Sequence, residues 1–339
     1  MNTLAEFDEP ESRDVYLRSF LKPFAAWLDD PDVTEIMINQ PGEIWIERSG
    51  ATKFERVEDP GVSNLLLQRL ATQIARVSHQ AINREQPLMS STLPTGERIQ
   101  FAGPPAAGEN WALSIRRHVV SNIALSDFPI AETVFKHRQN DPGATVNEKL
   151  SALLNAGRVE DFLRAAVRLR KTILVSGGTS TGKTSLLNAL LREIGDAERV
   201  ITVEDTPEVQ LQQPNRLGLL AVKGEMGEAR INMNDVLEAA LRMRPDRLIL
   251  GEIRGAEAAT YLRAINTGHP GSITTVHADS PEGALDQLAL MTMQAGLPLG
   301  RQETKDYIKS IVDIIIQVSR IEGKRVIEEI RFEPAQANS

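Results

Sequence analysis

The sequence predicts an α/β protein in which a smaller α+β amino-terminal domain precedes a larger domain built on a parallel sheet. Strand-like segments of the first part are joined by turns, as in antiparallel sheets, whereas strands alternate with helices in the second part. The 339 residues suffice for about two domains. We therefore expect domains at 1–138 and 147–339, joined by a polar linker at 139–146 that contains Pro142 and Gly143.

The amino-terminal domain should begin with a helix that is kinked at a proline. Tyr16, Phe20, Phe24 and Trp27 recur at helical spacing, and Pro23 interrupts that helix. The next two segments are TEIMIN (34–39) and EIWIE (43–47). They alternate apolar and polar residues with a turn between them, which predicts a β-hairpin. A helix is expected at 63–80. Three more strands are expected within LMSSTLP (88–94), ERIQFAG (97–103) and WALSIRRH (111–118).

The carboxy-terminal domain should alternate strand and helix. After helices near 147–155 and 159–169, the expected strands are TILVS (172–176), RVITVE (199–204), RLILGE (247–252) and SITTVH (272–277). Such alternation is typical of a parallel sheet covered by helices. A hairpin around Gly323 should close the domain.

Composition excludes several classes of protein. The chain has no cysteine, which excludes disulfide frameworks, cysteine-ligated metals and thiol catalysis. Its net charge is −8 and aromatic residues make up only 4%, so we expect no stable binding of nucleic acid. The acidic amino terminus does not resemble a signal peptide, and no apolar run is long enough to span a bilayer. We expect a soluble, cytoplasmic protein whose contact with a membrane is peripheral.

A phosphate-binding loop is the most specific local motif. The segment GGTSTGKT satisfies G-x-x-x-x-G-K-[ST], with an apolar strand before it and a helix after it, as that loop requires. Backbone amides and the helix amino terminus would bind phosphates, Lys183 would reach the β- and γ-phosphates, and the hydroxyl of Thr184 would bind Mg²⁺. The predicted nucleotide-binding residues are Gly177, Gly178, Thr179, Ser180, Thr181, Gly182, Lys183, Thr184 and Ser185.

Carboxylates follow two of the predicted strands. Glu204 ends one strand and is followed by Asp205 and Glu208, and Glu252 lies at the end of another strand. In phosphate-loop enzymes, such a carboxylate handles Mg²⁺ or the attacking water. We therefore expect Glu252 to act in catalysis and, with Glu204 or Asp205, to help hold the metal.

A histidine and two arginines complete the candidate site. His277 ends a predicted strand, where the ligands of α/β sheets gather, and it could sense the γ-phosphate. His269 is as readily explained as a structural loop residue. Arg116 and Arg117 end a strand of the first domain, and either could act as an arginine finger. From their position in the sequence alone, both arginines are better explained as solvent-exposed residues at the end of a strand.

Four segments together resemble the secretion ATPase superfamily. They are GGTSTGKT, ITVEDTPEVQL, LRMRPDRLILGEIRG and TGHPGSITTVHADSPEGAL, which resemble its Walker A, Asp box, Walker B and His box in order and spacing. VTEIMINQPGEIWIE and LPTGERIQ also resemble the branch that serves bacterial type IV secretion and conjugation. The likeness spans roughly residues 15–335.

The resemblance implies a homohexameric, Mg²⁺-dependent ATPase with a RecA-like second domain, ATP being bound between the two domains. It implies that Glu252 is the catalytic glutamate, Glu204 the Asp-box acid and His277 the His-box residue. Arg116 or Arg117 would face the γ-phosphate. It also implies that the partners are the other cytoplasmic ATPases and the inner-membrane components of a secretion channel.

Three alternatives stay open at this point. A pilus assembly or retraction ATPase belongs to the same class of motor. A RecA-like DNA translocase is a second alternative, which the net charge of −8 disfavours. The third is a nucleotide-gated scaffold that binds but does not hydrolyse ATP, which an assay of turnover would distinguish from a motor. We predict an ATP-hydrolysing motor that powers type IV secretion at the inner membrane.

Overall fold

The computed structural model describes residues 17, 19–117, 142–222, 229 and 231–332. Contacts divide the chain into two compact units, one of residues 1–119 with 217–244 and the other of residues 120–216 with 245–339. Each unit has its own apolar core. Among the described residues, no helix has the length and hydropathy needed to cross a membrane.

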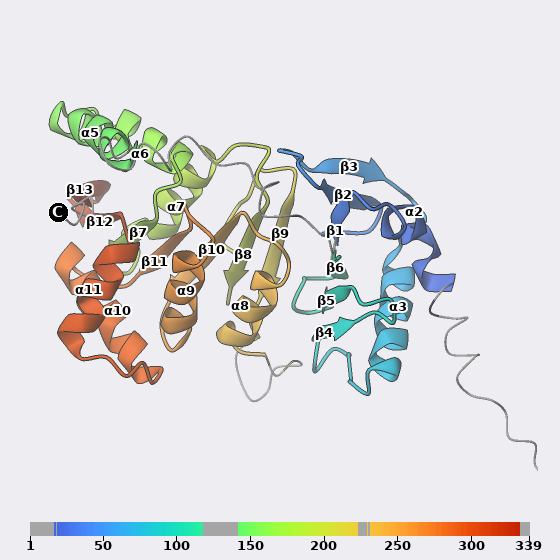
Figure 1. Ribbon diagram of the computed structural model, residues 1–339. Helices are drawn as coiled ribbons and strands as arrows, with labels where there is room; N and C mark the ends of the chain where they lie inside the picture. The colour runs from blue at the N-terminus through green and yellow to red at the C-terminus, as the bar shows by residue number, and fades with distance from the viewer. Residues whose placement is uncertain (1–16, 18, 118–141, 223–228, 230, 333–339) are drawn as a thin grey trace, which may run out of the picture. The chain divides into compact units, whose positions relative to one another are not determined.

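The first unit is built on an antiparallel sheet with strand order β3-β2-β1-β6-β5-β4 (Figure 1). The strands are β1 (Val33–Ile38), β2 (Glu43–Arg48), β3 (Glu55–Glu58), β4 (Leu88–Thr92), β5 (Arg98–Ala102) and β6 (Ala112–Arg116). Gly42 adopts a φ of 88° in the turn between β1 and β2, a conformation that glycine adopts without steric cost. The predicted hairpin and the three later strands are thus confirmed, whereas the short, mostly exposed β3 was not predicted.

Helices cover one side of this sheet. The stripe interrupted by Pro23 forms a 3-10 turn, η1 (Lys22–Phe24), followed by α2 (Ala25–Leu28), which confirms the predicted break, while Tyr16 falls outside the described residues. The helix α3 (Asn64–Val77) buries Leu67, Leu70 and Ile74 against the sheet. The hydroxyl of Ser63 caps α3 by accepting a hydrogen bond from the amide of Leu66 at 3.2 Å.

Residues 217–244 group with the first unit, although the predicted domain 147–339 contains them. This segment includes all but the first residue of β9 (Arg216–Leu220) and the helix α8 (Met233–Leu241), and α8 contacts β4 and β5. The amide of Leu220 donates to the carbonyl of Ala106 at 2.7 Å, and Arg244 forms an ion pair with Glu47. The prediction differs here because chain order does not show that a segment packs on a distant part of the sequence.

The second unit contains a mainly parallel sheet in which neighbouring strands run β13-β12-β7-β11-β10-β8. The strands are β7 (Ile173–Gly177), β8 (Val200–Glu204), β10 (Arg247–Ile253), β11 (Ile273–Val276), β12 (Ile314–Ile321) and β13 (Lys324–Phe332). Only β13 runs antiparallel within this set, as the predicted closing hairpin requires. The predicted α/β class is therefore confirmed.

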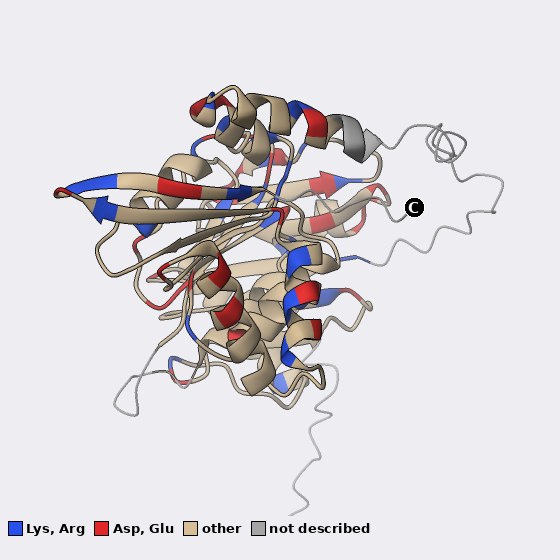
Figure 2. Cartoon of the chain, turned by 90° about the vertical axis from the view of Figure 1, so that its left-hand side faces the viewer, with Lys and Arg blue, Asp and Glu red and all other residues tan. Residues whose placement is uncertain are grey.

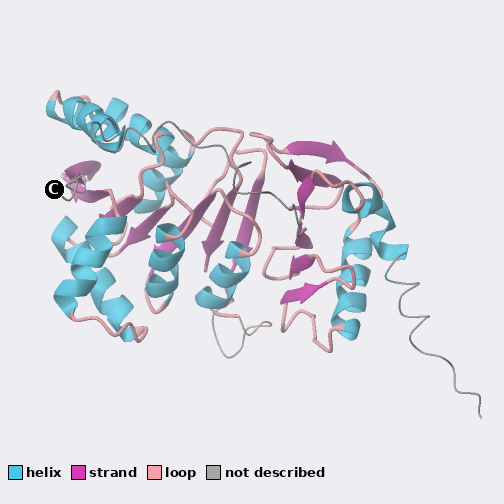
Figure 3. Ribbon diagram, viewed as in Figure 1, coloured by secondary structure: helices cyan, strands magenta, loops and turns pink. Residues whose placement is uncertain are grey.

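Helices lie on both faces of this sheet, with α5, α6 and α7 on one face and α9, α10 and α11 on the other (Figure 3). They are α5 (Pro142–Asn155), α6 (Val159–Arg168), α7 (Lys183–Leu191), α9 (Glu257–Asn266), α10 (Pro281–Gln294) and α11 (Arg301–Ile311). Because both faces are covered, the inner strands are largely buried, and all residues of β7, β8 and β11 are buried. Residues 142–146 of the predicted linker belong to α5, since proline fits the first turn of a helix, and residues 139–141 fall outside the described residues.

Candidate active site

The loop between β7 and α7 is shaped for close approach of an anion. Ser180 and Gly182 adopt positive φ values of 61° and 100°, a backbone conformation found in loops whose amides bind anions. A Cβ at Gly177 would lie 2.6 Å from the carbonyl oxygen of Val318, so only glycine fits there. The strand and helix that the motif requires flank the loop, as predicted.

A cavity of about 760 Å³ opens over this loop, at the carboxyl ends of the parallel strands. Its walls come from the second unit and include residues 178–185, the ends of β8 and β10, and the segment after β11. Lys183, Glu204, Glu252 and His277, which were selected from separate motifs, all line it. The fold therefore brings these predicted residues to one place.

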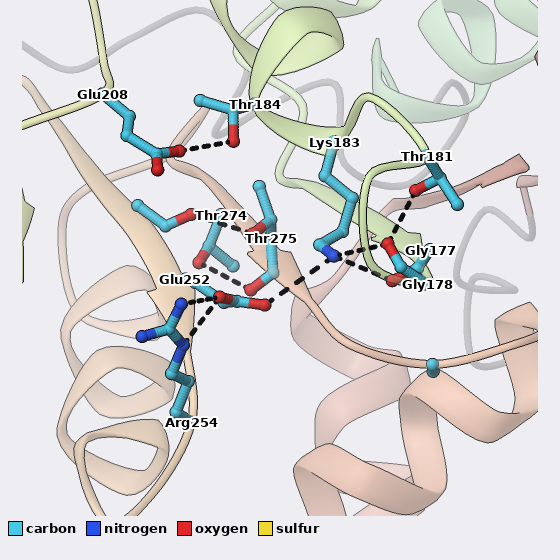
Figure 4. A network of polar contacts seen from close by, with 12 residues as sticks. Gly177, Gly178, Thr181, Lys183, Thr184, Glu208, Glu252, Arg254, Thr274 and Thr275 are labelled. Carbon is cyan, nitrogen blue, oxygen red and sulfur yellow. Dashed lines mark hydrogen bonds and ion pairs between the residues drawn. The ribbon is translucent and has the colours of Figure 1, made fainter. Parts of the chain in front are cut away.

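Lys183 is held by its own loop (Figure 4). Its ammonium donates hydrogen bonds to the carbonyl oxygens of Gly177 at 2.9 Å and Gly178 at 3.0 Å, and lies 3.8 Å from Oε1 of Glu252. Burial lowers the pKa of Lys183, and the nearby Glu252 carboxylate opposes that shift. A partly desolvated ammonium in this position is suited to a polyphosphate, which would replace the weaker carbonyl acceptors.

Glu252 is fixed by an arginine that the sequence analysis did not select (Figure 4). Arg254 donates to Oε2 of Glu252 from Nε at 2.7 Å and from Nη2 at 2.5 Å, while its Nη1 donates to Asp205 at 2.5 Å. This pairing orients the Glu252 carboxylate toward Lys183. The only signal in the sequence was the position of Arg254 two residues after Glu252.

Glu204 lines the cavity and also holds the loop that follows β8, and its role as a metal ligand stays a prediction. Its side chain is buried, and Oε1 accepts hydrogen bonds from the backbone amides of Glu208 at 3.0 Å and Val209 at 2.8 Å. Burial raises the pKa of Glu204, and those two amides oppose the shift. Glu204 thus anchors the loop that presents Glu208, whose Oε2 accepts a hydrogen bond from Thr184 at 3.0 Å.

Each histidine of the fourth motif has a distinct environment. The exposed side chain of His277 lines the cavity directly after β11. Nδ1 of His269 lies 3.0 Å from the carbonyl oxygen of Ala264, at the end of α9. The contact of His269 matches the structural interpretation of that residue, and His277 stays a predicted site residue.

Comparison with known proteins identifies the family. Residues 21–327 match the family described as type II/IV secretion system protein. The chain belongs to this family.

Relatives within the family are similar over nearly their whole length. The type IV secretion system protein VirB11 of Bartonella quintana is 37% identical over 329 residues, which cover 93% of this chain and 92% of the relative. The type IV secretion system protein PtlH of Bordetella pertussis is 36% identical and covered to 94%. The crystal structure of the VirB11 ATPase from the Brucella suis type IV secretion system, in complex with sulphate, superposes with a TM-score of 0.85 at 34% identity, with 94% of this chain and 98% of that chain covered. The predicted function is thereby confirmed: the chain is an ATPase of type IV secretion.

The two arginines predicted as alternative fingers have unlike surroundings in the first unit of this secretion ATPase. Nη1 of Arg117 donates to the carbonyl oxygens of Val33 at 2.9 Å, Trp27 at 3.4 Å and Asp30. Arg116 is 66% exposed, and its Nε lies 3.6 Å from Oε1 of Glu35. Arg117 therefore has a structural contact for its guanidinium, whereas Arg116 has most of its surface available.

The residues beside Thr184 fit a magnesium ion that is held mainly by substrate. Among the residues that the structure describes, no cluster of three or more histidine and carboxylate side chains could hold a metal by itself. The Thr184 hydroxyl and the Glu208 carboxylate, 3.0 Å apart, instead offer two hard oxygen ligands next to the phosphate loop. Mg²⁺ is commonly bound by one or two such groups together with phosphate oxygens and water, so this donor set fits it.

Proposed function

We propose that this ATPase is a Mg²⁺-dependent, homohexameric motor with a RecA-like second domain. The observation that carries the chemistry is the convergence of Lys183 and Glu252, 3.8 Å apart, in the cavity above the phosphate loop. An ammonium and a carboxylate so placed can bind a γ-phosphate and activate a water beside it. The similarity to VirB11 proteins over nearly the whole chain supports the assignment of the motor to secretion.

Each group of the site has a separate task in hydrolysis. The loop amides and Lys183 hold the phosphates and stabilise the charge that develops as the γ-phosphoryl group leaves. Glu252, oriented by Arg254, positions the attacking water and accepts its proton. Thr184 and Glu208 would hold Mg²⁺, which supplies electrostatic stabilisation of the phosphate oxygens when it is bound.

One arginine of Arg116 and Arg117 would complete the nucleotide site, and the more exposed Arg116 is the better candidate. Hydrolysis would then move amino-terminal and carboxy-terminal rings relative to each other. The partners would be other ATPases and inner-membrane components of the secretion channel, with this chain associated peripherally on the cytoplasmic side.

Replacing Lys183 with alanine tests the assignment. We expect ATP turnover to fall by about 10²-fold or more, because the lost charge faces the most anionic part of the transition state. Lys149→Ala is the matched control, since Lys149 is an exposed lysine on α5 of the same unit. The readouts are phosphate release and particle mass by light scattering with ATP and Mg²⁺. Normal turnover in Lys183→Ala would contradict the phosphate-loop mechanism. A wild type that stays monomeric with ATP and Mg²⁺ would contradict the proposed hexamer.

A further inference from the structure

An arginine from the carboxy-terminal hairpin reaches the phosphate loop. Nη1 of Arg325 donates a hydrogen bond to the hydroxyl of Ser185 at 3.0 Å, and Arg325 lines the cavity. A Cβ placed on Gly182 would lie 2.7 Å from Cδ of Arg325, so the aliphatic part of this side chain lies directly over the glycine. Neither contact follows from a motif, because Arg325 lies 140 residues beyond Ser185.

The sheet fixes Arg325 in this place. Val318 of β12 pairs in parallel with Gly177 of β7, and Arg325 pairs with Arg320 across the hairpin β12–β13. Figure 2 shows this hairpin projecting from the unit, with basic residues near its tip and acidic residues farther along β13. Register therefore presents the Arg325 guanidinium to the first turn of α7.

The hairpin lies on the opposite side of β7 from the catalytic carboxylates. The strand order places β12 and β13 on one side of β7, whereas β11, β10 and β8 lie on the other, where Glu252 and Glu204 end their strands. A nucleotide whose γ-phosphate meets Lys183 and Glu252 must extend its α-phosphate and ribose away from that side. The guanidinium of Arg325 lies on this other side, 3.0 Å from the hydroxyl of Ser185 in the first turn of α7.

The charge of Arg325 is available for a ligand. Arg254 is paired with two carboxylates, whereas no described carboxylate forms an ion pair with Arg325, whose hydrogen-bond partner is the neutral Ser185. A planar guanidinium can form two parallel hydrogen bonds to a phosphate. From this geometry we infer that Arg325 binds the α-phosphate and ribose end of the nucleotide. The inference rests on the proposed function of the cavity as an ATP site.

The test compares Arg325→Ala with Arg320→Ala. Arg320 is exposed on the same hairpin and donates to the carbonyl oxygen of Gly323, so its loss removes the same charge away from the cavity. We expect Arg325→Ala to raise the Kd of both ATP and ADP by a similar factor, about 10- to 100-fold, as for a lost charge-assisted hydrogen bond. The kcat at saturating ATP should stay within about threefold, because the contact is the same in ground and transition states. Arg320→Ala should bind both nucleotides as the wild type does.

Fluorescent nucleotide titration and phosphate release give these values, and thermal unfolding shows whether each variant is folded. Arg325→Lys keeps the charge and should recover part of the affinity for nucleotide. If the alanine variant does not fold, the Kd values of Arg325→Lys are compared with those of the wild type instead. A wild type that hydrolyses ATP beside Arg325 variants with unchanged Kd values overturns the inference and leaves the proposed function intact. A loss of kcat or of ATP affinity with unchanged ADP affinity also overturns it, since Arg325 would then act on the γ-phosphate. A wild type that neither binds nor hydrolyses ATP refutes the proposed function instead.

Discussion

The hydroxyl of Thr184 donates a hydrogen bond to the carboxylate of Glu208 at 3.0 Å, which joins the first turn of α7 to the loop after β8. Glu208 is presented there because the buried Glu204 carboxylate accepts hydrogen bonds from the backbone amides of residues 208 and 209. Glu204 therefore shapes the loop, and Glu208 faces the site. This division of roles separates two residues that lie four positions apart in the sequence.

Glu208→Gln should raise the Mg²⁺ concentration needed for half-maximal turnover by about 10-fold or more, within the range observed when a group near a metal is lost. The amide keeps the shape of the side chain but has no negative charge to attract the cation. Phosphate release is measured across a MgCl₂ titration at saturating ATP. Glu160→Gln, a change to an exposed acid on α6, is the control. An unchanged Mg²⁺ dependence in Glu208→Gln would separate Glu208 from the metal.

Glu252→Gln should bind ATP with an affinity within a few-fold of the wild type but lose about 10²- to 10⁴-fold in turnover. Glutamine can still accept a hydrogen bond from Arg254, so the geometry is kept, whereas an amide cannot take the proton of the attacking water. Nucleotide titration and single-turnover hydrolysis give the two quantities. Equal losses of binding and turnover would instead assign Glu252 mainly to the metal.

Arg117→Ala should destabilise the protein by about 1–3 kcal/mol, because it leaves backbone carbonyls around Val33 without their donor. Arg116→Ala should cost less than this, because Arg116 is 66% exposed and its Nε lies 3.6 Å from the buried Glu35 carboxylate, beyond hydrogen-bond distance. Urea unfolding, followed by circular dichroism, measures both. The reverse order of effects would contradict the structural role of Arg117.

The same pair of variants separates the candidates for the arginine finger. If Arg116 is the finger, Arg116→Ala should lower turnover by about 10³-fold with a much smaller loss of ATP affinity, because a finger acts chiefly on transition-state charge. Phosphate release and nucleotide titration are measured on each single variant and on the double variant. Full activity in the double variant would remove both arginines from the reaction.

The affinity for ATP should fall as the pH rises into the alkaline range. This fall should begin at a lower pH than the pKa of a free lysine would predict. Burial lowers the pKa of Lys183 below its ordinary 10.5, so its ammonium loses the proton earlier as the pH rises, and binding of the polyanion then requires that proton to be taken up again. The Kd is measured from pH 7 to 10.5 for the wild type and for Lys183→Ala. Only the wild type should lose affinity in this way as the pH rises. Parallel curves for the two proteins would show that a group other than Lys183 causes the loss.

Local pattern determined most of the fold and the core of the site. The alternation of apolar residues predicted the hairpin of the first unit, and the sequence of strand, glycine-rich loop and helix predicted the placement of Lys183 and Thr184. These features depend on side-chain periodicity and on glycine conformations, which neighbouring residues along the chain specify. Glu204 and Glu252 could be predicted as site residues because each lies at a strand end, and parallel strands bring their carboxyl ends to one edge of the sheet.

Only the tertiary structure decided which side chains meet. Glu208 contacts Thr184, Arg254 holds Glu252 and Asp205 together, and Arg325 reaches Ser185 from a strand 140 residues away. The packing of 217–244 with the first unit was decided in the same way. Hydrogen bonds and ion pairs depend on separations of about 3–4 Å between atoms, and strand register and loop conformation set those separations. The sequence by itself determined the kinds of chemical group and the strand ends that carry them, whereas pairing across the sheet decided their partners.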